Sequence, residues 1–269
     1  MRQTPALGLR ERAAARRDRD HDRAHVRIAA MTAKISEIAE NVARVRERIA
    51  RAAQRAGRRS EEITLVAVSK TFPAEAIRAV YQTGVRHFGE NRVQEFEAKR
   101  AALSDLREVT WHMIGHVQSN KARKAAELFG RVDSIDRFSL AEKLDAAIAE
   151  GARGERLPVL IEAKLGGEAS KSGVEEAGLA QLAEDVMQKC SDLELRGLMA
   201  IPPYFDDADR ARPYFRRLRE LRDELQQKIG RELPVLSMGM SHDFEVAVEE
   251  AATQVRIGTA IFGERERSK

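Results

Sequence analysis

The residue with the clearest chemical potential is Lys70, which directly follows a run of apolar and β-branched residues at 64–69. Such a run predicts a buried strand, and a lysine at its end is partly enclosed. Burial disfavours the charged ammonium, and the neutral amine is the form that condenses with an aldehyde to give a Schiff base. Position alone would equally suit a lysine that lays its stem along the surface and keeps its amine in water.

Two segments near the carboxyl end of the chain have the composition of an anion site. Residues 237–241 read Ser-Met-Gly-Met-Ser and residues 256–260 read Arg-Ile-Gly-Thr-Ala, each at or after the end of an expected strand. Small residues let backbone N–H groups approach an anion, and we expect Ser241 to cap a helix that has Asp243 in its first turn. Each glycine alone fits an ordinary tight turn, but two such loops side by side favour a phosphate. A phosphate with a carbonyl in reach of Lys70 describes pyridoxal 5′-phosphate.

Arg256 is the third candidate. It alternates with Val255 and Ile257, so its side chain faces the opposite way from theirs, into the mouth of a barrel if they point outward. An arginine beside the pyridine nitrogen of the cofactor keeps its own proton, so the ring nitrogen stays unprotonated and the ring is a weak electron sink. This favours holding the cofactor over carbanion chemistry. A salt-bridged barrel arginine is the alternative.

Three further polar residues are less specific. Asn91 follows the expected second strand and could hydrogen-bond the cofactor ring or its lysine. His112 lies within the third strand, where we expect a hydrogen-bonded structural histidine rather than a catalytic one. Lys171 follows the fifth strand, where a solvated loop lysine is favoured over a second amine at the mouth.

Familiar motifs of other chemistries are missing. The sequence has no Walker A pattern, no HExxH and no Gly-x-Gly-x-x-Gly after a strand. Its six histidines have no metal-ligand spacing, so we predict no metal site.

The elements that must position these residues alternate along the chain. Short apolar or β-branched runs predict eight strands at 64–69, 86–89, 111–115, 132–135, 158–163, 195–201, 234–238 and 254–258. Helical stretches lie between them, near 74–83, 91–103, 119–129, 138–150, 175–190, 209–229 and 242–252. This alternation predicts a parallel sheet, and eight strands favour a single closed (β/α)8 TIM-type barrel over a doubly wound open sheet. In such a barrel the functional groups lie at the carboxyl ends of the strands.

An extra helix is expected before the barrel, because Ile35, Ile38, Val42, Val45 and Ile49 recur at spacings of three and four. Residues 1–31 are instead dense in charge and lack an apolar period, so we predict a disordered basic extension, with Met31 as a possible start of the functional chain. Residues 32–269 form one domain in this prediction.

Composition narrows the class and the compartment. Residues 1–30 contain eight Arg and four Asp or Glu, which accounts for the whole formal charge of +4, so the body is neutral and no nucleic-acid partner is expected. The single cysteine allows no intramolecular disulfide, and no apolar run is long enough to span a membrane. The first thirty residues are rich in Arg and have no apolar stretch, so we expect no secretory signal there. These features predict a cytoplasmic protein without a membrane partner.

Several ordered segments also resemble one known family, that of the pyridoxal phosphate homeostasis proteins (YggS-like, or proline synthetase co-transcribed). The matching segments are AVSKT (67–71), FGEN (88–91) with VQE (93–95), WHMIG (111–115) with QSNK (118–121), SKSG (170–173), RGLMAI (196–201), SMGMS (237–241) and VRIGTAIFG (255–263). The first 30 residues are not part of the family pattern.

The resemblance implies a barrel similar to the N-terminal domain of alanine racemase, with the Schiff base on Lys70. It also implies contact of Arg256 with the ring nitrogen, and phosphate contacts from Ser241, Gly258 and Thr259 with the nearby backbone of Gly239 and Met240. Such proteins are regarded as carriers or regulators of vitamin B6, so we expect a monomer with no catalytic residue that could pass pyridoxal phosphate to apo-enzymes.

Two other functions remain open at this point. One is an amino-acid racemase of the alanine racemase class that uses the same cofactor. A racemase needs a second base, and none of Tyr81, Tyr204 and Tyr214 closes an expected strand. The other is a barrel for a different phosphorylated ligand.

Overall fold

The computed structural model describes residues 33–151, 154–166 and 172–264. Eight parallel strands close into a barrel in sequence order, and β1 pairs with β8. The strands are β1 (Thr64–Val68), β2 (His87–Glu90), β3 (Thr110–Met113), β4 (Arg131–Ile135), β5 (Leu157–Glu162), β6 (Leu193–Met199), β7 (Val235–Ser237) and β8 (Gln254–Ile257). The closed order confirms the predicted barrel and excludes the open sheet.

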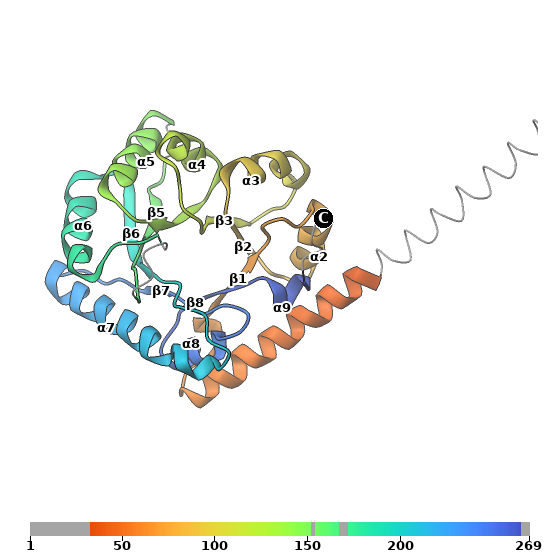
Figure 1. The fold of residues 1–269 in the computed structure, drawn as a ribbon. Helices are drawn as coiled ribbons and strands as arrows, with labels where there is room; N and C mark the ends of the chain where they lie inside the picture. Colours follow the sequence, from red (N-terminus) through yellow and green to blue (C-terminus); the bar gives the residue numbers. More distant parts are fainter. Residues whose placement is uncertain (1–32, 152–153, 167–171, 265–269) are drawn as a thin grey trace, which may run out of the picture.

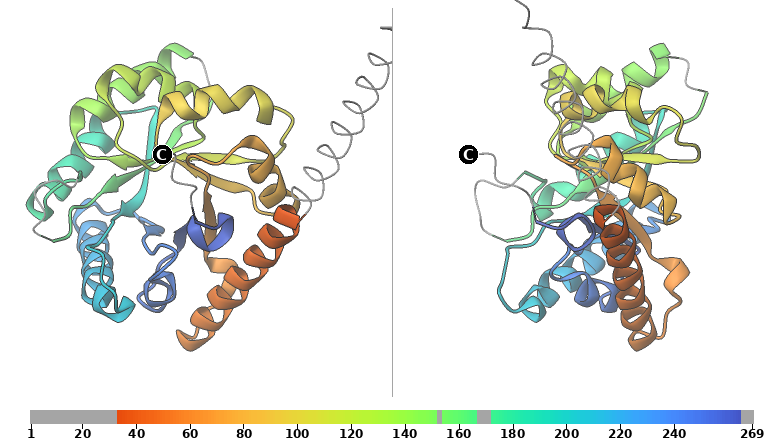
Figure 2. Two further views of the ribbon diagram at one scale, coloured as in Figure 1. Left: turned by 45° about the vertical axis from the view of Figure 1, so that its right-hand side comes forward. Right: turned by 90° about the vertical axis from the view of Figure 1, so that its right-hand side faces the viewer.

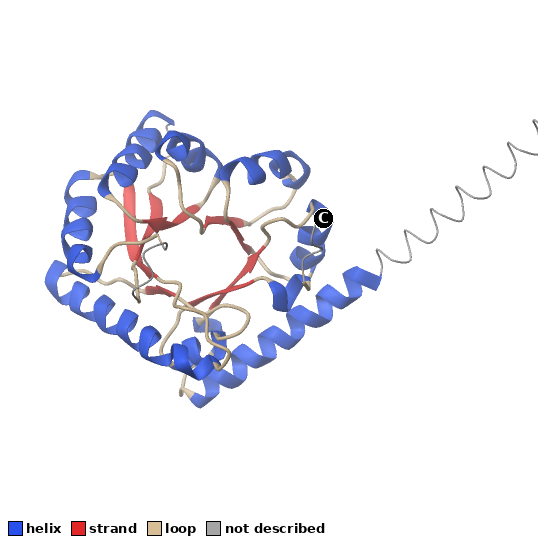
Figure 3. Ribbon diagram, in the orientation of Figure 1, coloured by secondary structure: helices blue, strands red, loops and turns tan. Residues whose placement is uncertain are grey.

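Helices surround the strands as a ring (Figures 1 and 3). They are α2 (Ala74–Gln82), α3 (Val93–Arg100), α4 (Ala122–Leu128), α5 (Phe138–Gly151), α6 (Glu176–Lys189), α7 (Arg212–Ile229), α8 (Phe244–Glu249) and α9 (Thr259–Phe262). The first seven match the predicted helical stretches. The short α9 follows β8 and was not predicted.

The apolar core lies between the outer faces of the strands and the helices. In β8, Val255 and Ile257 are fully buried and belong to this layer. Gln254 and Arg256 alternate with them and make their hydrogen bonds to residues of other strands inside the barrel. The period of two in the strand therefore divides an apolar shell from a polar interior.

One glycine sets the register of β6. The pairing of β5 with β6 shifts between Val159 and Leu160, which pair with Leu195 and Gly197, so Arg196 is an extra residue. Gly197 has φ +154°, and a Cβ there would lie 1.8 Å from the Val235 carbonyl oxygen. Only glycine fits a bulge at this distance from β7.

The N-terminal helix (residues 33–55) lies along the outside of the barrel, where Figure 2 shows it in two views. Its buried stripe contains Ile38, Val42, Val45 and Ile49, as the spacing predicted, whereas Ile35 is 37% exposed. The Asn41 side-chain amide donates to the Ile261 carbonyl of α9 over 2.9 Å. The helix therefore braces an element beside the expected phosphate loop.

Three remaining observations concern the chain as a whole. Cys190 is 2% exposed, and burial raises the pKa of its thiol to about 11. Within the described ranges, no helix has both the length and the apolar character needed to cross a membrane. The predicted extension at 1–31 lies outside the described residues.

Candidate functional site

The turn after β1 places Lys70 at the carboxyl end of the barrel. Lys70 lies two residues beyond Val68 and is half-buried. The next aromatic residue, Phe72, stacks on Phe262 of α9 with ring centroids 4.5 Å apart. This contact joins the lysine turn to the segment after β8.

The segment after β8 lies beside this turn. Ala67 pairs with Ile257, and a Cβ on Gly258 would lie 3.6 Å from the Val68 carbonyl oxygen. The structure thus brings the backbone that carries Lys70 next to Gly258 and Thr259. The backbones of the two turns are therefore neighbours at the carboxyl end of the barrel.

Ser241 joins the loops that follow β7 and β8. Its Oγ accepts from the Gly258 amide over 3.3 Å and from the Ala260 amide over 3.2 Å. The expectation that Ser241 caps the helix after β7 is wrong, because α8 begins later and has Asp243 at its N-cap position. The Ser241 hydroxyl instead binds the first turn of α9, which the sequence did not reveal.

Gly239 and Met240 form the tight loop between β7 and Ser241. Gly239 has φ +91°, and a Cβ there would lie 2.9 Å from Phe244 Cα and 2.6 Å from Ala247 Cβ. The Met240 amide donates to Asp243 Oδ1 over 2.7 Å. Glycine is therefore required by the packing of α8, and the Met240 amide already has a carboxylate partner in this structure.

Arg256 points into the barrel, as the alternation in β8 predicted. It is 3% exposed, and its guanidinium donates to Ser237 Oγ over 2.7 Å and to the Ala200 carbonyl over 2.9 Å. Burial lowers the pKa of Arg256, opposed by the charges of Asp133, Glu162 and Asp243. Hydrogen bonds to Ser237 of β7 and to the residue that follows β6 fix the plane of the guanidinium.

A chain of polar side chains continues below Arg256 through the barrel. Gln254 donates from Nε2 to Ser237 Oγ and to Asp133 Oδ2, each over 2.8 Å. Asp133 Oδ2 also lies 2.9 Å from His112 Nδ1, and His112 Nε2 lies 3.0 Å from His87 Nδ1. His112 is therefore a hydrogen-bonded structural histidine, as predicted. Sequence patterns could not reveal this series of hydrogen-bonded side chains, because its members come from five different strands.

Asn91 lies on another part of the same mouth. It lines a cleft of about 680 Å³ together with Glu95, His116, Gln118 and Lys121. A Cβ on Gly115 would lie 2.4 Å from the Asn91 carbonyl oxygen, so this glycine allows the loops after β2 and β3 to touch. Most of the side chains that line the cleft are polar or charged, and β2, which Asn91 follows, pairs with β1.

A further carboxylate, Glu162, ends β5 and was missed by the sequence analysis. It is 4% exposed, and its Oε1 accepts from the Ser172 hydroxyl over 3.0 Å. Burial raises the pKa of Glu162, opposed by that hydrogen bond and by Arg256. Lys171 lies outside the described residues.

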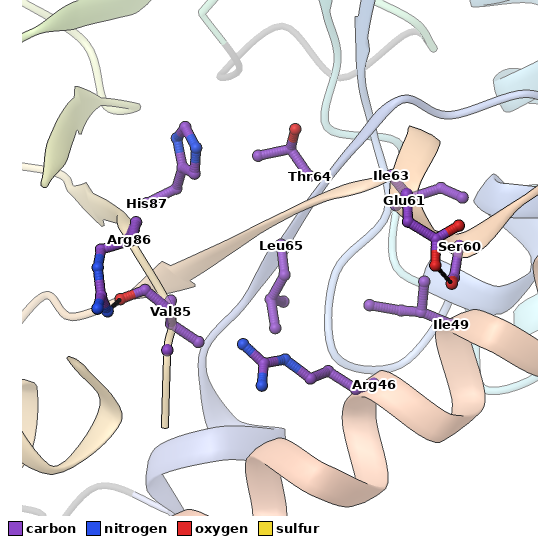
Figure 4. Close-up of a pocket in the computed structure, with 11 residues that line it drawn as sticks. Arg46, Ile49, Ser60, Glu61, Ile63, Thr64, Leu65, Val85, Arg86 and His87 are labelled. Atoms are coloured by element: carbon purple, nitrogen blue, oxygen red, sulfur yellow. Dashed lines mark hydrogen bonds between the residues drawn. The ribbon is translucent and has the colours of Figure 1, made fainter. Parts of the chain in front are cut away.

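A separate pocket of about 370 Å³ opens at the opposite end of the barrel (Figure 4). Thr64 and His87, the first residues of β1 and β2, line it together with Arg46 and Arg86. Both arginines already donate to backbone carbonyls, namely those of Thr83 and Tyr81. Because barrel sites form at the carboxyl ends of the strands, we do not assign the cofactor site to this pocket.

Comparison with known proteins gives the family. The model of the alanine racemase N-terminal domain matches residues 38–266. The pyridoxal phosphate homeostasis protein of Aquifex aeolicus is 48% identical over 201 residues, which cover 75% of this chain and 86% of that protein. That of Pseudomonas aeruginosa is 49% identical over 234 residues, or 86% and 97% of the two chains. The chain belongs to the pyridoxal phosphate homeostasis protein family.

Solved structures agree with membership of the pyridoxal phosphate homeostasis family. PipY of Synechococcus elongatus, in a structure with PLP bound, has a TM-score of 0.74 at 40% identity, covering 84% of this chain and 100% of PipY. Alanine racemase of Corynebacterium glutamicum has a TM-score of 0.61 at 20% identity, covering 86% of this chain and 62% of the racemase. The racemase shares the barrel fold.

Proposed function

We propose that this chain binds pyridoxal 5′-phosphate and acts in vitamin B6 homeostasis, holding the cofactor as a Schiff base on Lys70. The observation that carries the proposal is the contact between the turn after β1 and the loop after β8, with Gly258 beside Val68. The PLP-bound structure of PipY, at 40% identity, supports the same cofactor here.

The side chains at this mouth suit each part of the cofactor. The Ser241 hydroxyl, Gly258 and Thr259 would hold the phosphate, and Arg256 would face the ring nitrogen. Gly239 and Met240 would flank the phosphate, and Asn91 would lie toward the ring or its lysine. The bound cofactor would supply an aldehyde, and the Lys70 amine would condense with it and release one water molecule.

We propose a carrier rather than a dedicated enzyme. Arg256 has three carboxylates that favour its charged form, so it would not give a proton to the ring nitrogen. Without that proton the ring withdraws few electrons from a bound amino acid. The named homeostasis relatives support this reading, and the racemase alternative has no comparable support.

Incubation with D- or L-alanine tests the absence of turnover. We expect no sustained change of chirality by the loaded protein. Racemisation at ordinary enzyme rates, on the order of 1 per second or faster, would replace the carrier with an enzyme.

The Schiff-base lysine is tested by substitution and trapping. Wild-type protein loaded with pyridoxal phosphate and reduced with borohydride should yield one modified peptide, containing Lys70. Lys70→Ala should lose the visible absorption of the adduct and the modified peptide, whereas Lys124→Ala, at an exposed position on α4, should keep both. A band that survives in Lys70→Ala would disprove the assignment of the lysine.

We propose that the protein is a monomer, acts in the cytoplasm and releases the cofactor to apo-enzymes that use it. Sedimentation at micromolar concentration would measure the first. Activation of an apo-enzyme by loaded wild-type protein, but not by borohydride-reduced protein, would support the last.

A further inference from the structure

Residues of helix α3 form hydrogen bonds to the turn that carries Lys70. The Lys99 ammonium donates to the carbonyl oxygens of Ser69 over 3.2 Å and of Phe72 over 3.4 Å. It also donates to Glu90 Oε1 over 2.8 Å. One amine therefore ties both ends of the four-residue turn to the end of β2, and its three N–H donors are matched by three acceptors.

Glu90, at the end of β2, also takes part in these contacts. It is fully buried, and besides Lys99 it accepts from the Ser69 hydroxyl over 2.6 Å. In the part of the chain that the structure describes, its other oxygen, Oε2, has no hydrogen-bond partner. Replacement of a buried ion pair by apolar side chains of similar volume often causes no loss of stability. Stability alone therefore does not explain why Glu90 and Lys99 are paired here.

The turn itself has a conformation that must be held. Thr71 has φ +67°, a left-handed value that is rare for a β-branched residue. Its amide donates to the Glu95 carboxylate, one turn before Lys99 on α3. Strained residues of this kind persist where the surroundings fix them, and they concentrate at functional sites.

We infer that Glu90 and Lys99 are positioning residues that aim the Lys70 amine at the phosphate loop. The inference rests on the proposed function. Because all three donors of the Lys99 ammonium are engaged, the same contacts keep this nearby amine from condensing with the aldehyde itself. The two lysines at the turn thus have separate tasks, one covalent and one structural.

The rate at which apo-protein forms the adduct tests the inference. We expect Glu90→Gln and Lys99→Met to form the visible band at least about tenfold more slowly than wild type at saturating pyridoxal phosphate. Lys99→Arg keeps the charge and should recover most of the rate. Glu97→Gln is the matched control, because Glu97 lies on the same helix, is exposed and pairs with Lys124. It should behave as wild type.

Two further readouts separate positioning from stability. Thermal unfolding of each apo-protein shows whether it is folded, and borohydride trapping shows which lysine reacts. In Glu90→Gln, we expect part of the label to move from Lys70 to Lys99, which a merely structural defect would not cause.

If Glu90→Gln does not fold, Glu95→Ala gives the second measurement, again with an expected fall in rate, because it releases the Thr71 amide and removes a carboxylate 3.8 Å from the Lys99 ammonium. Wild-type rate and label confined to Lys70 in the folded variants would overturn the inference. Failure of wild type to label Lys70 would instead overturn the proposed function, so the two failures are distinguishable.

Discussion

The two histidines inside the barrel share one hydrogen bond, between His87 Nδ1 and His112 Nε2. The other nitrogen of His112 faces the Asp133 carboxylate, so a neutral His112 donates there and accepts from His87. Burial lowers the pKa of His87 to about 4, helped by the nearby His112 and Arg131 and opposed by Asp133.

The low pKa of His87 predicts that the protein becomes less stable as the pH falls through the range in which this histidine titrates. Between pH 6.5 and about 4 the unfolded chain binds a proton that the folded chain does not, so the free energy of unfolding decreases as pH falls through that window. The full shift corresponds to about 3 kcal/mol, and screening of the partly exposed ring reduces the expected loss to about 2 kcal/mol.

Urea unfolding at several pH values measures this loss. His87→Gln keeps a donor and does not titrate, so its free energy of unfolding should change less than that of wild type over the same window. Parallel curves for the two proteins would show that other groups cause the pH dependence.

The sequence could predict residues whose role is set locally. The position of Lys70 after β1 and the inward direction of Arg256 follow from strand ends and alternation. The partner of Ser241 could not be predicted, because the hydroxyl binds amides 17 and 19 residues away. The same holds for Gln254 and Asp133, which are 121 residues apart in the chain.

At the scale of elements, periodicity decided what could be predicted. The N-terminal helix and the eight strands have clear periods over several turns or pleats. The helix α9 has four residues, too few for a period of 3.6, so its segment was predicted only as an anion-binding loop. Its existence explains why Ser241 lies over the amides of this segment.

The N-terminal helix should contribute to stability through its buried stripe. Ile49 is 4% exposed, so Ile49→Ala should lower the free energy of unfolding by about 2–5 kcal/mol. Ile35→Ala is the matched control on the same helix, because Ile35 is 37% exposed. It should change stability by less than about 0.5 kcal/mol in urea unfolding. Equal effects would mean that the helix does not pack on the barrel as described.

At the scale of the whole molecule, the polar interior connects the two ends of the barrel. His87 lines the pocket at the amino ends of the strands, and Arg256 lies below the proposed cofactor site. Asp133, fully buried between them, is the carboxylate of this hydrogen-bonded series of side chains. Burial alone would raise the pKa of Asp133, but His112, Arg131 and the Gln254 amide keep it below its usual value.

Removal of this charge should be costly. Asp133→Asn keeps the shape but leaves the charges of Arg131 and of the buried Arg256 less compensated, so we expect a loss of about 3 kcal/mol in the free energy of unfolding. Asp223→Asn is the control, because Asp223 pairs with Arg222 on the surface and is 49% exposed. That change should cost about 1 kcal/mol or less in the same urea titration. Similar losses in both variants would contradict a special role of the interior charge.

The single thiol of the chain has a practical consequence. Cys190 is 2% exposed and has a pKa of about 11, so at neutral pH almost none of it is the reactive thiolate. A maleimide dye would therefore attach to a cysteine introduced at an exposed site, such as Tyr204 on the loop after β6, which is 72% exposed. The protein could thus carry a fluorophore at one chosen position, without replacement of the native thiol.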